Sequence, residues 1–181
     1  PLTLFAAHRA GTDGNSMTAA LSPDSTVAVI GAGAMGAGIA QIAALNGHRV
    51  QLHDTRFGAG DAAKKGIAET LDKLVAKGRL ARADADAAVA RIATVVALPD
   101  VCVAQLVIEA IVEDLGAKQE LLQRIENVVT SECILASNTS SFSITALGAG
   151  MKHPGRVVGM HFFNPAPLMP LVEIVSGLAT S

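Results

Sequence analysis

Two residues near the end of the chain, His161 and Glu173, are of types that move and stabilise a proton. Each lies in an apolar run of strand-forming residues, and the segment 164–170 between the two runs contains three prolines, which make it rigid. If the runs fold back on each other about Pro167, His161 faces Glu173 with Cβ atoms roughly 4.5–5.5 Å apart. A carboxylate at that separation can orient an imidazole, which makes His161 a candidate general base.

A second group, the glycines of segment 31–36, fits the chemistry of phosphate binding. Gly31, Gly33 and Gly36 follow a β-branched apolar run and open a segment with helical spacing of apolar residues. In such a turn the first glycine permits the tight bend, the second lets backbone approach a pyrophosphate, and the third lets helix pack on strand. The N–H groups and positive dipole end of the helix then favour an anion.

Asp54 supplies the acid that a dinucleotide-binding turn requires about 20 residues downstream, where the ribose 2′-hydroxyl is held. A carboxylate there repels the 2′-phosphate of NADP, so NAD is predicted over NADP. Arg56 argues the other way, because an arginine can accept that phosphate. The alternative is a glycine turn that binds no nucleotide. Such a turn has no need of the strand, glycines, helix and acid in this order, so their order favours nucleotide binding.

Polar residues also follow the apolar run 133–136, in the loop Ser137-Asn138-Thr139-Ser140-Ser141. Such residues commonly form a turn or a helix cap. Their place at the carboxyl edge of a sheet, where doubly wound folds bind ligands, favours a site. Lys118 falls within the apolar stripe of a helix, which indicates either a snorkelling side chain or a cation in the cleft, paired with Glu113.

These residues require a scaffold in which strand ends meet. Apolar runs alternate with helical periodicity, which predicts an α/β fold of the Rossmann type, with a doubly wound, mostly parallel sheet and antiparallel pairing at the C-terminal end. Two helical patterns after the second strand predict an inserted helical hairpin. The expected strands are 26–30, 49–53, 94–97, 105–109, 133–136, 156–163 and 171–175, and the expected helices are 34–46, 60–77, a segment with Ala85, Val89 and Ile92 on one face, 114–129 and one that begins near Ser143.

The composition of the 181 residues argues against several functions. With five Phe and no Tyr or Trp, the chain lacks the aromatic platforms that bind single-stranded nucleic acid. A formal net charge of −2 gives no reason to bind DNA or a membrane surface, and no apolar run is long enough to span a bilayer. Cys102 and Cys133 lie in apolar surroundings and are interpreted as reduced core residues of a cytoplasmic protein. No metal site is predicted.

Four separated segments, taken together, resemble the 3-hydroxyacyl-CoA dehydrogenase family. They are Val29–Ala40, Val107–Glu113, Ser137–Ser141 and His161–Glu173, and the similarity extends over Val27–Ser181. It is greatest to bacterial members that act on 3-hydroxybutyryl-CoA or 3-hydroxyadipyl-CoA. The resemblance implies NAD as cofactor and a reversible oxidation of (S)-3-hydroxyacyl-CoA to 3-oxoacyl-CoA, in fatty-acid, butanoate or aromatic-acid metabolism.

The resemblance also implies roles for single residues. His161 matches the base that takes the proton of the 3-hydroxyl as hydride leaves carbon 3, Glu173 matches the carboxylate that orients it, and Ser140 matches the residue bound to the substrate oxygen. The positions that match cofactor contacts are Gly31, Gly33, Ala34, Met35, Gly36, Asp54, Glu113, Lys118 and Asn138. The positions that match substrate contacts are Thr70 and Lys77, which share one helix face and touch the CoA portion, together with Ser140 and Asn164.

Members of the family continue into an all-helical domain that supplies an active-site Asn and most of the dimer contact. This chain stops at Ser181, where that domain should begin. We therefore expect residues 17–181 to be the NAD-binding Rossmann domain of a homodimeric enzyme, and the chain to be a fragment that binds cofactor and is inactive alone. Residues 1–16 are interpreted as a leader or an artificial extension, because Met17 resembles a natural start.

Two other functions remain open from the sequence. Relatives of this fold serve as lens crystallins, so the chain could be a nucleotide-binding structural protein; the intact set of His161, Glu173 and Ser140 argues against that. A dehydrogenase of small free hydroxy acids would need no CoA contacts, and Thr70 and Lys77 argue modestly against it.

Overall fold

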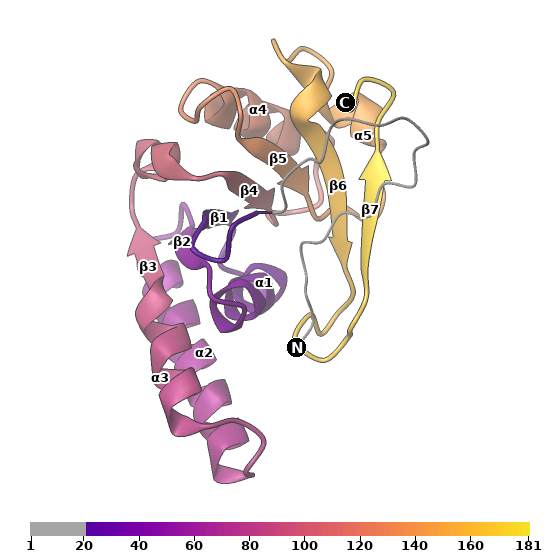
Figure 1. The fold of residues 1–181 in the computed structure, drawn as a ribbon. Coiled ribbons are helices and arrows are strands. Elements are labelled where there is room, and N and C mark those ends of the chain that lie inside the picture. The colour runs from indigo at the N-terminus through magenta and orange to yellow at the C-terminus, as the bar shows by residue number, and fades with distance from the viewer. Residues whose placement is uncertain (1–20) are drawn as a thin grey trace.

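The structure is a computed structural model that describes residues 21–181. The segment 1–16, interpreted above as a leader or extension, lies outside the described residues. The strands form one seven-stranded sheet (Figure 1). Their bounds are β1 Thr26–Ile30, β2 Arg49–His53, β3 Ile92–Val95, β4 Leu106–Glu109, β5 Ile134–Ser137, β6 Val157–Phe162 and β7 Val172–Ser176.

The strand order is β3-β2-β1-β4-β5-β6-β7. The chain runs outward from β1 to β3 and then crosses over β1 to begin β4, so the order reverses between β1 and β4. In a doubly wound sheet such a reversal opens a crevice at the carboxyl ends of the two strands. All neighbours are parallel except β6 and β7, which confirms the predicted fold class.

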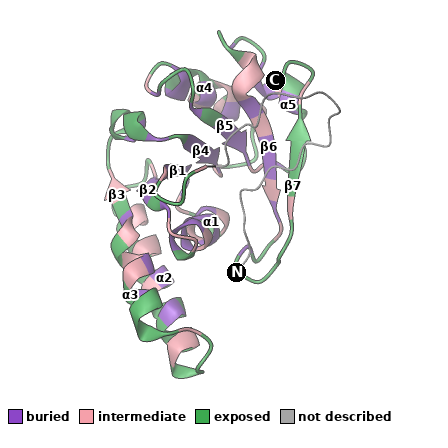
Figure 2. Cartoon of the chain, in the orientation of Figure 1, coloured by how far each residue is buried: buried purple, intermediate pink, exposed green. Residues whose placement is uncertain are grey.

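Helices cover both faces of the sheet, which explains why all five residues of β1 are buried and why all of them except Thr26 are apolar. One face carries α1 (Ala34–Leu45), α2 (Ala59–Ala76) and α3 (Arg82–Arg91); the other carries α4 (Leu115–Glu126) and α5 (Ile144–Leu147). Figure 2 shows the buried residues along β1, β4, β5 and the inner side of α1. Two short 3₁₀ turns, Leu98–Val103 and Pro154–Arg156, complete the elements.

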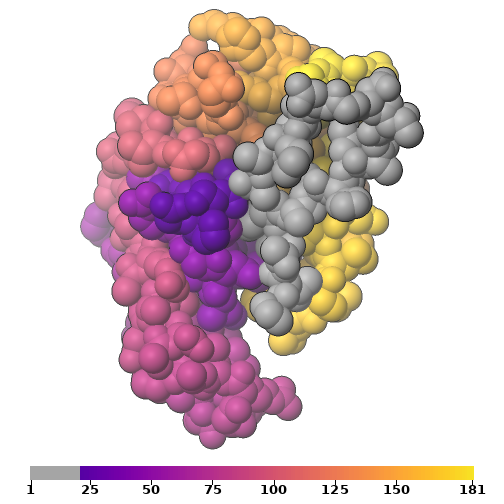
Figure 3. All heavy atoms as spheres, viewed as in Figure 1, coloured from indigo at the N-terminus to yellow at the C-terminus, as the bar shows by residue number. Residues whose placement is uncertain are grey.

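The predicted helical hairpin is present as α2 and α3, which extend away from the sheet (Figures 1 and 3). Its second helix is shorter than expected, because Ile92 is not on the helix face but begins β3. The backbone of Ile92 is extended, with φ −92° and ψ 114°, and the residue pairs with Val50 of β2. Consequently β3 begins two residues before the expected strand 94–97, and Val96 is exposed.

Two further expectations require correction. The 3₁₀ turn Leu98–Val103 was not expected; its three-residue period turns Leu98 and Val101 into the core and leaves Cys102 exposed. Only Cys133 is therefore a core cysteine. The helix expected over 114–129 is α4, which is shorter and ends at Glu126; Asp114 is its N-cap and accepts a hydrogen bond from Ala117 N at 2.8 Å.

The antiparallel pair β6–β7 has the predicted register, with His161 opposite Glu173. In the part of the chain that the structure describes, every helix is too short or too polar to cross a membrane.

Candidate functional site

Three glycines with different surroundings shape the turn between β1 and α1. Gly31 has a φ of +104°, and a Cβ there would lie 2.5 Å from the carbonyl oxygen of Ala110. A Cβ on Gly36 would lie 1.7 Å from the carbonyl oxygen of Gly31, so α1 can lie this close to the turn only with a glycine at position 36. A Cβ on Gly33 would meet no described atom within 4 Å. The fold thus requires Gly31 and Gly36, whereas Gly33 leaves space for a ligand.

The turn opens into a cleft of about 710 Å³ at the carboxyl ends of β1, β2 and β4, the place of the strand-order reversal. Gly33 is the N-cap of α1, and no side chain of residues 21–181 caps this helix end. The first N–H groups of α1 therefore lie at the cleft, which Gly33, Ala34 and Met35 line, and are suited to a pyrophosphate. The opposite wall is formed by Ala110, Ile111 and Val112, which follow β4 directly.

Asp54 lies at the end of β2 and lines the same cleft. Its Oδ2 accepts a hydrogen bond from Ala32 N at 2.8 Å, which ties it to the glycine turn. Hydrogen bonds from the Arg56 guanidinium are the main reason that the pKa of Asp54 falls to about 2. The carboxylate is therefore an ionised acceptor at the predicted position for a ribose hydroxyl.

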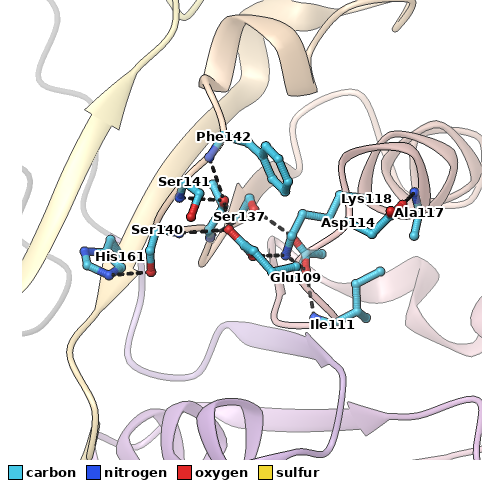
Figure 4. A network of polar contacts seen from close by, with 12 residues as sticks. Glu109, Ile111, Asp114, Ala117, Lys118, Ser137, Ser140, Ser141, Phe142 and His161 are labelled. Carbon is cyan, nitrogen blue, oxygen red and sulfur yellow. Dashed lines mark hydrogen bonds and ion pairs between the residues drawn. The ribbon is translucent and has the colours of Figure 1, made fainter.

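Two buried charges, those of Glu109 and Lys118, belong to the polar network drawn in Figure 4. Glu109, the last residue of β4, is fully buried, and Lys118 of α4 is 1% exposed; Lys118 Nζ lies 2.6 Å from Glu109 Oε1. The Glu109 carboxylate also accepts hydrogen bonds from Ile111 N at 2.7 Å and Ser137 Oγ at 2.6 Å. The interpretation of Lys118 as a snorkelling side chain is wrong, since its ammonium is buried and forms ion pairs with carboxylate oxygens.

Lys118 also contacts Glu113, as expected, with Nζ 3.2 Å from Oε2. The other oxygen of Glu113 accepts hydrogen bonds from the Thr139 hydroxyl and from Ser140 N, the latter at 3.2 Å. Burial alone would raise the pKa of Glu113, but the Thr139 hydroxyl and the Lys118 ammonium outweigh it and hold that pKa below its ordinary value. Segment 109–113 therefore lines the cofactor cleft through Ala110, Ile111 and Val112, and anchors the loop that carries Ser140 through Glu113.

Ser140 and His161 meet at the end of this network. The Ser140 hydroxyl lies 3.0 Å from His161 Nε2, and Glu173 Oε2 lies 3.0 Å from Nδ1 of the same ring. In the neutral ring the Glu173 carboxylate, which only accepts, holds the proton on Nδ1 and leaves Nε2 as an acceptor. The ring of Phe163 supports the imidazole at a centroid distance of 4.7 Å. The structure thus brings together the three predicted catalytic residues.

The remaining predicted residues are spread more widely. Asn138 joins β5 to β6, since its Oδ1 accepts a hydrogen bond from Phe162 N at 2.9 Å. Asn164 is exposed in the proline-rich loop. Thr70 of α2 lines a second groove of about 580 Å³ that adjoins the glycine turn, whereas Lys77 lies beyond it as the C-cap of α2. Lys118, Glu113 and Asn138 surround the Ser140 loop and do not line the cofactor cleft.

Three residues of the network were missed in the sequence, Glu109, Ser137 and Thr139. The sequence suggests only that Glu109 is the polar end of a strand. Its carboxylate can be buried because Lys118, nine positions away on a different element, pairs with it. The signal that could have found it is an acid at the carboxyl end of the strand next to the glycine turn, where ligand sites occur. Ser137 and Thr139 were considered only as part of the polar loop.

Comparison with known proteins assigns the family. The sequence model of the NAD-binding domain of 3-hydroxyacyl-CoA dehydrogenase matches residues 26–181. The chain belongs to this family. Its cofactor is accordingly NAD, as the glycine turn and Asp54 predicted.

Relatives of the chain include a 3-hydroxyadipyl-CoA dehydrogenase of Escherichia coli, 47% identical over 86% of this chain and 33% of the relative, and a 3-hydroxybutyryl-CoA dehydrogenase of Clostridioides difficile, 41% identical over 86% of this chain and 55% of the relative. The crystal structure of an (S)-3-hydroxybutyryl-CoA dehydrogenase from Ralstonia eutropha superposes with a TM-score of 0.83 at 43% identity, over 86% of this chain and 55% of that one. The chain spans about half, or less, of the length of these relatives.

The residues of the cleft fit NAD. The space over Gly33 can admit a pyrophosphate, because it is the one glycine of the turn whose missing side chain the fold itself does not fill. Ala32 N holds the Asp54 carboxylate beside that turn, and an acid at this place is what the fingerprint uses to bind the ribose.

Proposed function

We propose that the protein takes part in the NAD-dependent, reversible oxidation of (S)-3-hydroxyacyl-CoA to 3-oxoacyl-CoA. The observation that carries the proposal is the hydrogen-bonded set Ser140–His161–Glu173, which adjoins the NAD cleft through segment 109–113. A hydride acceptor and a proton acceptor on one sheet edge are the two requirements for oxidising an alcohol. The names of the relatives, which include 3-hydroxybutyryl-CoA and 3-hydroxyadipyl-CoA dehydrogenases, support the substrate class.

NAD, when bound, supplies the acceptor for the hydride that leaves carbon 3. His161 Nε2 takes the proton of the 3-hydroxyl, so that the electron pair of the O–H bond becomes the second bond of the carbonyl. Glu173 holds Nδ1 and stabilises the positive ring that results. The Ser140 hydroxyl, which donates to Nε2 in this structure, donates to the substrate oxygen when that oxygen lies beside the ring.

The neighbouring residues hold this geometry. Gly31, Gly33, Ala34, Met35, Gly36 and Asp54 bind the pyrophosphate and ribose of the cofactor. Glu113 fixes the backbone of Ser140, Lys118 fixes Glu113, and Asn138 fixes the strand of His161 through Phe162 N. Each of these contacts reduces the freedom of the Ser140–His161 pair, which favours the orientation that proton transfer requires.

CoA binding is proposed along α2 of the hairpin. Thr70 lies in the groove next to the glycine turn, and Lys77 ends the same helix with a cation suited to the phosphates of CoA. Asn164 is proposed to contact the acyl portion, since it follows β6 two residues after Phe162. A helical domain that completes the acyl site, and a homodimer formed through it, are proposed from the length of the relatives that the chain does not match.

The location we propose is the cytoplasm, where thiols such as Cys133 stay reduced. The metabolic role we propose is the oxidation of fatty-acid, butanoate or aromatic-acid derivatives. It is supported by a relative from Psychrobacter arcticus, 40% identical over 85% of this chain, that is named as a subunit of the fatty acid oxidation complex.

The test uses two polypeptides: this chain, and this chain followed by the unmatched C-terminal part of the Clostridioides difficile relative, called here the extended chain. Oxidation of NADH is followed with acetoacetyl-CoA or with free acetoacetate. Turnover with acetoacetyl-CoA that free CoA inhibits supports the proposal. Equal turnover with free acetoacetate would indicate a dehydrogenase of free acids, and NADH binding without turnover in the extended chain would indicate a structural protein.

A further inference from the structure

The carboxylate of Asp54 has no acceptor position left. It accepts hydrogen bonds from Ala32 N at 2.8 Å and Arg56 N at 2.9 Å, and from Nε and Nη2 of the Arg56 guanidinium at 3.1 Å each. Two of these donors are backbone groups and two belong to one side chain. A carboxylate offers about four lone-pair positions, so all of them are occupied.

A ribose hydroxyl therefore reaches Asp54 only after one donor has left. Ala32 N belongs to the glycine turn and Arg56 N to the short connection after β2, and neither can move without disturbing the backbone. The Arg56 side chain is 70% exposed, whereas that of Asp54 is 9% exposed. The guanidinium is thus the donor that departs. The free energy of breaking its ion pair with Asp54 then reduces the affinity for NAD.

The guanidinium has a second use once it leaves. Arg56 lines both the NAD cleft and the adjoining groove of Thr70, so its side chain lies on the ridge between them. A 2′-phosphate on the adenosine ribose would project to the same ridge, next to Asp54. A guanidinium binds phosphate through two parallel hydrogen bonds, which an ammonium cannot reproduce.

We propose that Arg56 is a specificity-determining residue for the cofactor, because it competes with the ribose of NAD for Asp54 and binds the 2′-phosphate of NADP. The same side chain thereby weakens the binding of NAD and strengthens the binding of NADP. The difference in affinity between the two cofactors is therefore smaller than it would be without Arg56. The proposal rests on NAD binding alone and not on the reaction proposed above.

The experiment is calorimetric titration of the chain with NADH and with NADPH, for the wild type and for Arg56→Ala, Arg56→Lys and Arg82→Ala. Arg82 is the matched control, because it forms an exposed ion pair with Asp72 on the hairpin, outside both grooves. In Arg56→Ala we expect NADH to bind about twofold to fivefold more tightly, the range that release of an exposed ion pair allows. We expect NADPH to bind about tenfold more weakly, as for a lost charge-assisted pair.

Arg56→Lys should fall between wild type and Arg56→Ala for NADPH, since it keeps the charge without the planar fork. Unchanged or weaker NADH binding in Arg56→Ala would overturn the competition, and unchanged NADPH binding, or none in the wild type, would overturn the phosphate contact. Equal shifts in Arg82→Ala would reduce the effect to net charge and overturn both. Circular dichroism spectra that match the wild type establish that each variant is folded. Turnover is not measured, so the outcome is independent of the substrate.

Discussion

His161 is the residue on which the proposed chemistry depends most directly, because both of its nitrogen atoms have defined partners. In the extended chain, His161→Gln should lower kcat about 10²–10⁴-fold, the usual share of general acid–base catalysis, while NADH affinity stays unchanged. The assay is acetoacetyl-CoA reduction at saturating NADH, with His153→Gln as control, since His153 is exposed on the turn before β6. Turnover within about twofold of wild type would remove His161 from the mechanism.

The buried pair Glu109–Lys118 allows a test of what each charge requires. Lys118→Met leaves the Glu109 carboxylate buried without a cation, and we expect the free energy of unfolding to fall by about 3–5 kcal/mol. The double variant Glu109→Gln with Lys118→Met removes both charges at nearly constant volume and should recover most of that loss. Urea unfolding measures both values. Independent, additive effects would show that the two charges do not stabilise each other.

The residues of the site differ in how far the sequence predicts them. The pairing of His161 with Glu173 follows from the two strand patterns about Pro167, because antiparallel register is a local property. The burial of Glu109 does not follow from its neighbours, because it depends on Lys118 and Ser137, which belong to other elements. Cys102 shows the same limit: an apolar sequence around it predicts burial, and the 3₁₀ turn exposes it.

At the scale of elements, the glycine turn separates a role in folding from a role in binding. Gly33→Ala adds a methyl group where no described atom lies within 4 Å, so the unfolding free energy should be unchanged while NADH binding is lost or weakened at least tenfold, about 1.4 kcal/mol. Gly36→Ala forces a methyl group to 1.7 Å from Gly31 O, so it should destabilise the domain itself. Thermal unfolding and calorimetry distinguish the two. Equal destabilisation by both variants would contradict this division.

Glu126 of α4 joins that helix to the connection before β6. Its two oxygens accept hydrogen bonds from Lys152 N and His153 N, both at 2.9 Å. Burial raises the pKa of Glu126, but these N–H groups and Arg156 lower it by more than burial raises it. The pKa therefore lies below its ordinary value of 4.5. Because the pKa of Glu126 is lower in the folded than in the unfolded state, its charge stabilises the fold at any pH above the unfolded-state pKa. This stabilisation is lost as the pH falls through the folded-state pKa.

Glu126→Gln should therefore cost about 1–3 kcal/mol of unfolding free energy near neutral pH, because one N–H then faces an amide NH₂. The difference from wild type should shrink as pH falls below 4.5. Urea unfolding at a series of pH values gives the curve, and Glu132→Gln, at an exposed residue after α4, is the control. A difference that does not change with pH would mean that the charge of Glu126 has no part in this contact.

Element boundaries were predictable where local chemistry determines them. β1, β2 and the start of α1 match the expected ranges, because the β-branched run of β1 ends at Gly31 and β2 lies between Gly47 and Asp54. The end of α3 does not match, because Ile92 can continue the helical pattern or pair with Val50, and only the neighbouring strand decides. Helical periodicity over 60–92 correctly indicated a hairpin, since two long amphipathic segments need each other and α1 to bury their apolar sides.

The whole molecule allows a test of how much of the catalytic site one domain supplies. We expect this chain to bind NADH and to reduce acetoacetyl-CoA far more slowly than the extended chain, because closing a site excludes water and completes the catalytic arrangement. Both are assayed side by side at saturating NADH. Comparable turnover would show that residues up to Ser181 suffice.

The same comparison tests a surface expectation. Leu168, Leu171 and Ile174, on β7 and the loop before it, are 74%, 50% and 60% exposed. An apolar edge strand of this kind favours association between chains, so this chain should show concentration-dependent self-association in sedimentation experiments. The extended chain should give one defined species. A monodisperse monomer of this chain would contradict the expectation.

The hairpin of β6 and β7 has a consequence for the order in which the molecule assembles. His161 and Glu173 are 12 positions apart, so bringing them together closes a short loop. The cofactor half needs Val27 to meet Leu106, and the entropy lost in closing a loop grows with its length. The proton-transfer pair is thus encoded within a single local unit, whereas the nucleotide site requires most of the chain. A substitution in the hairpin can accordingly change the proton-transfer pair while the nucleotide site, which other segments build, stays intact.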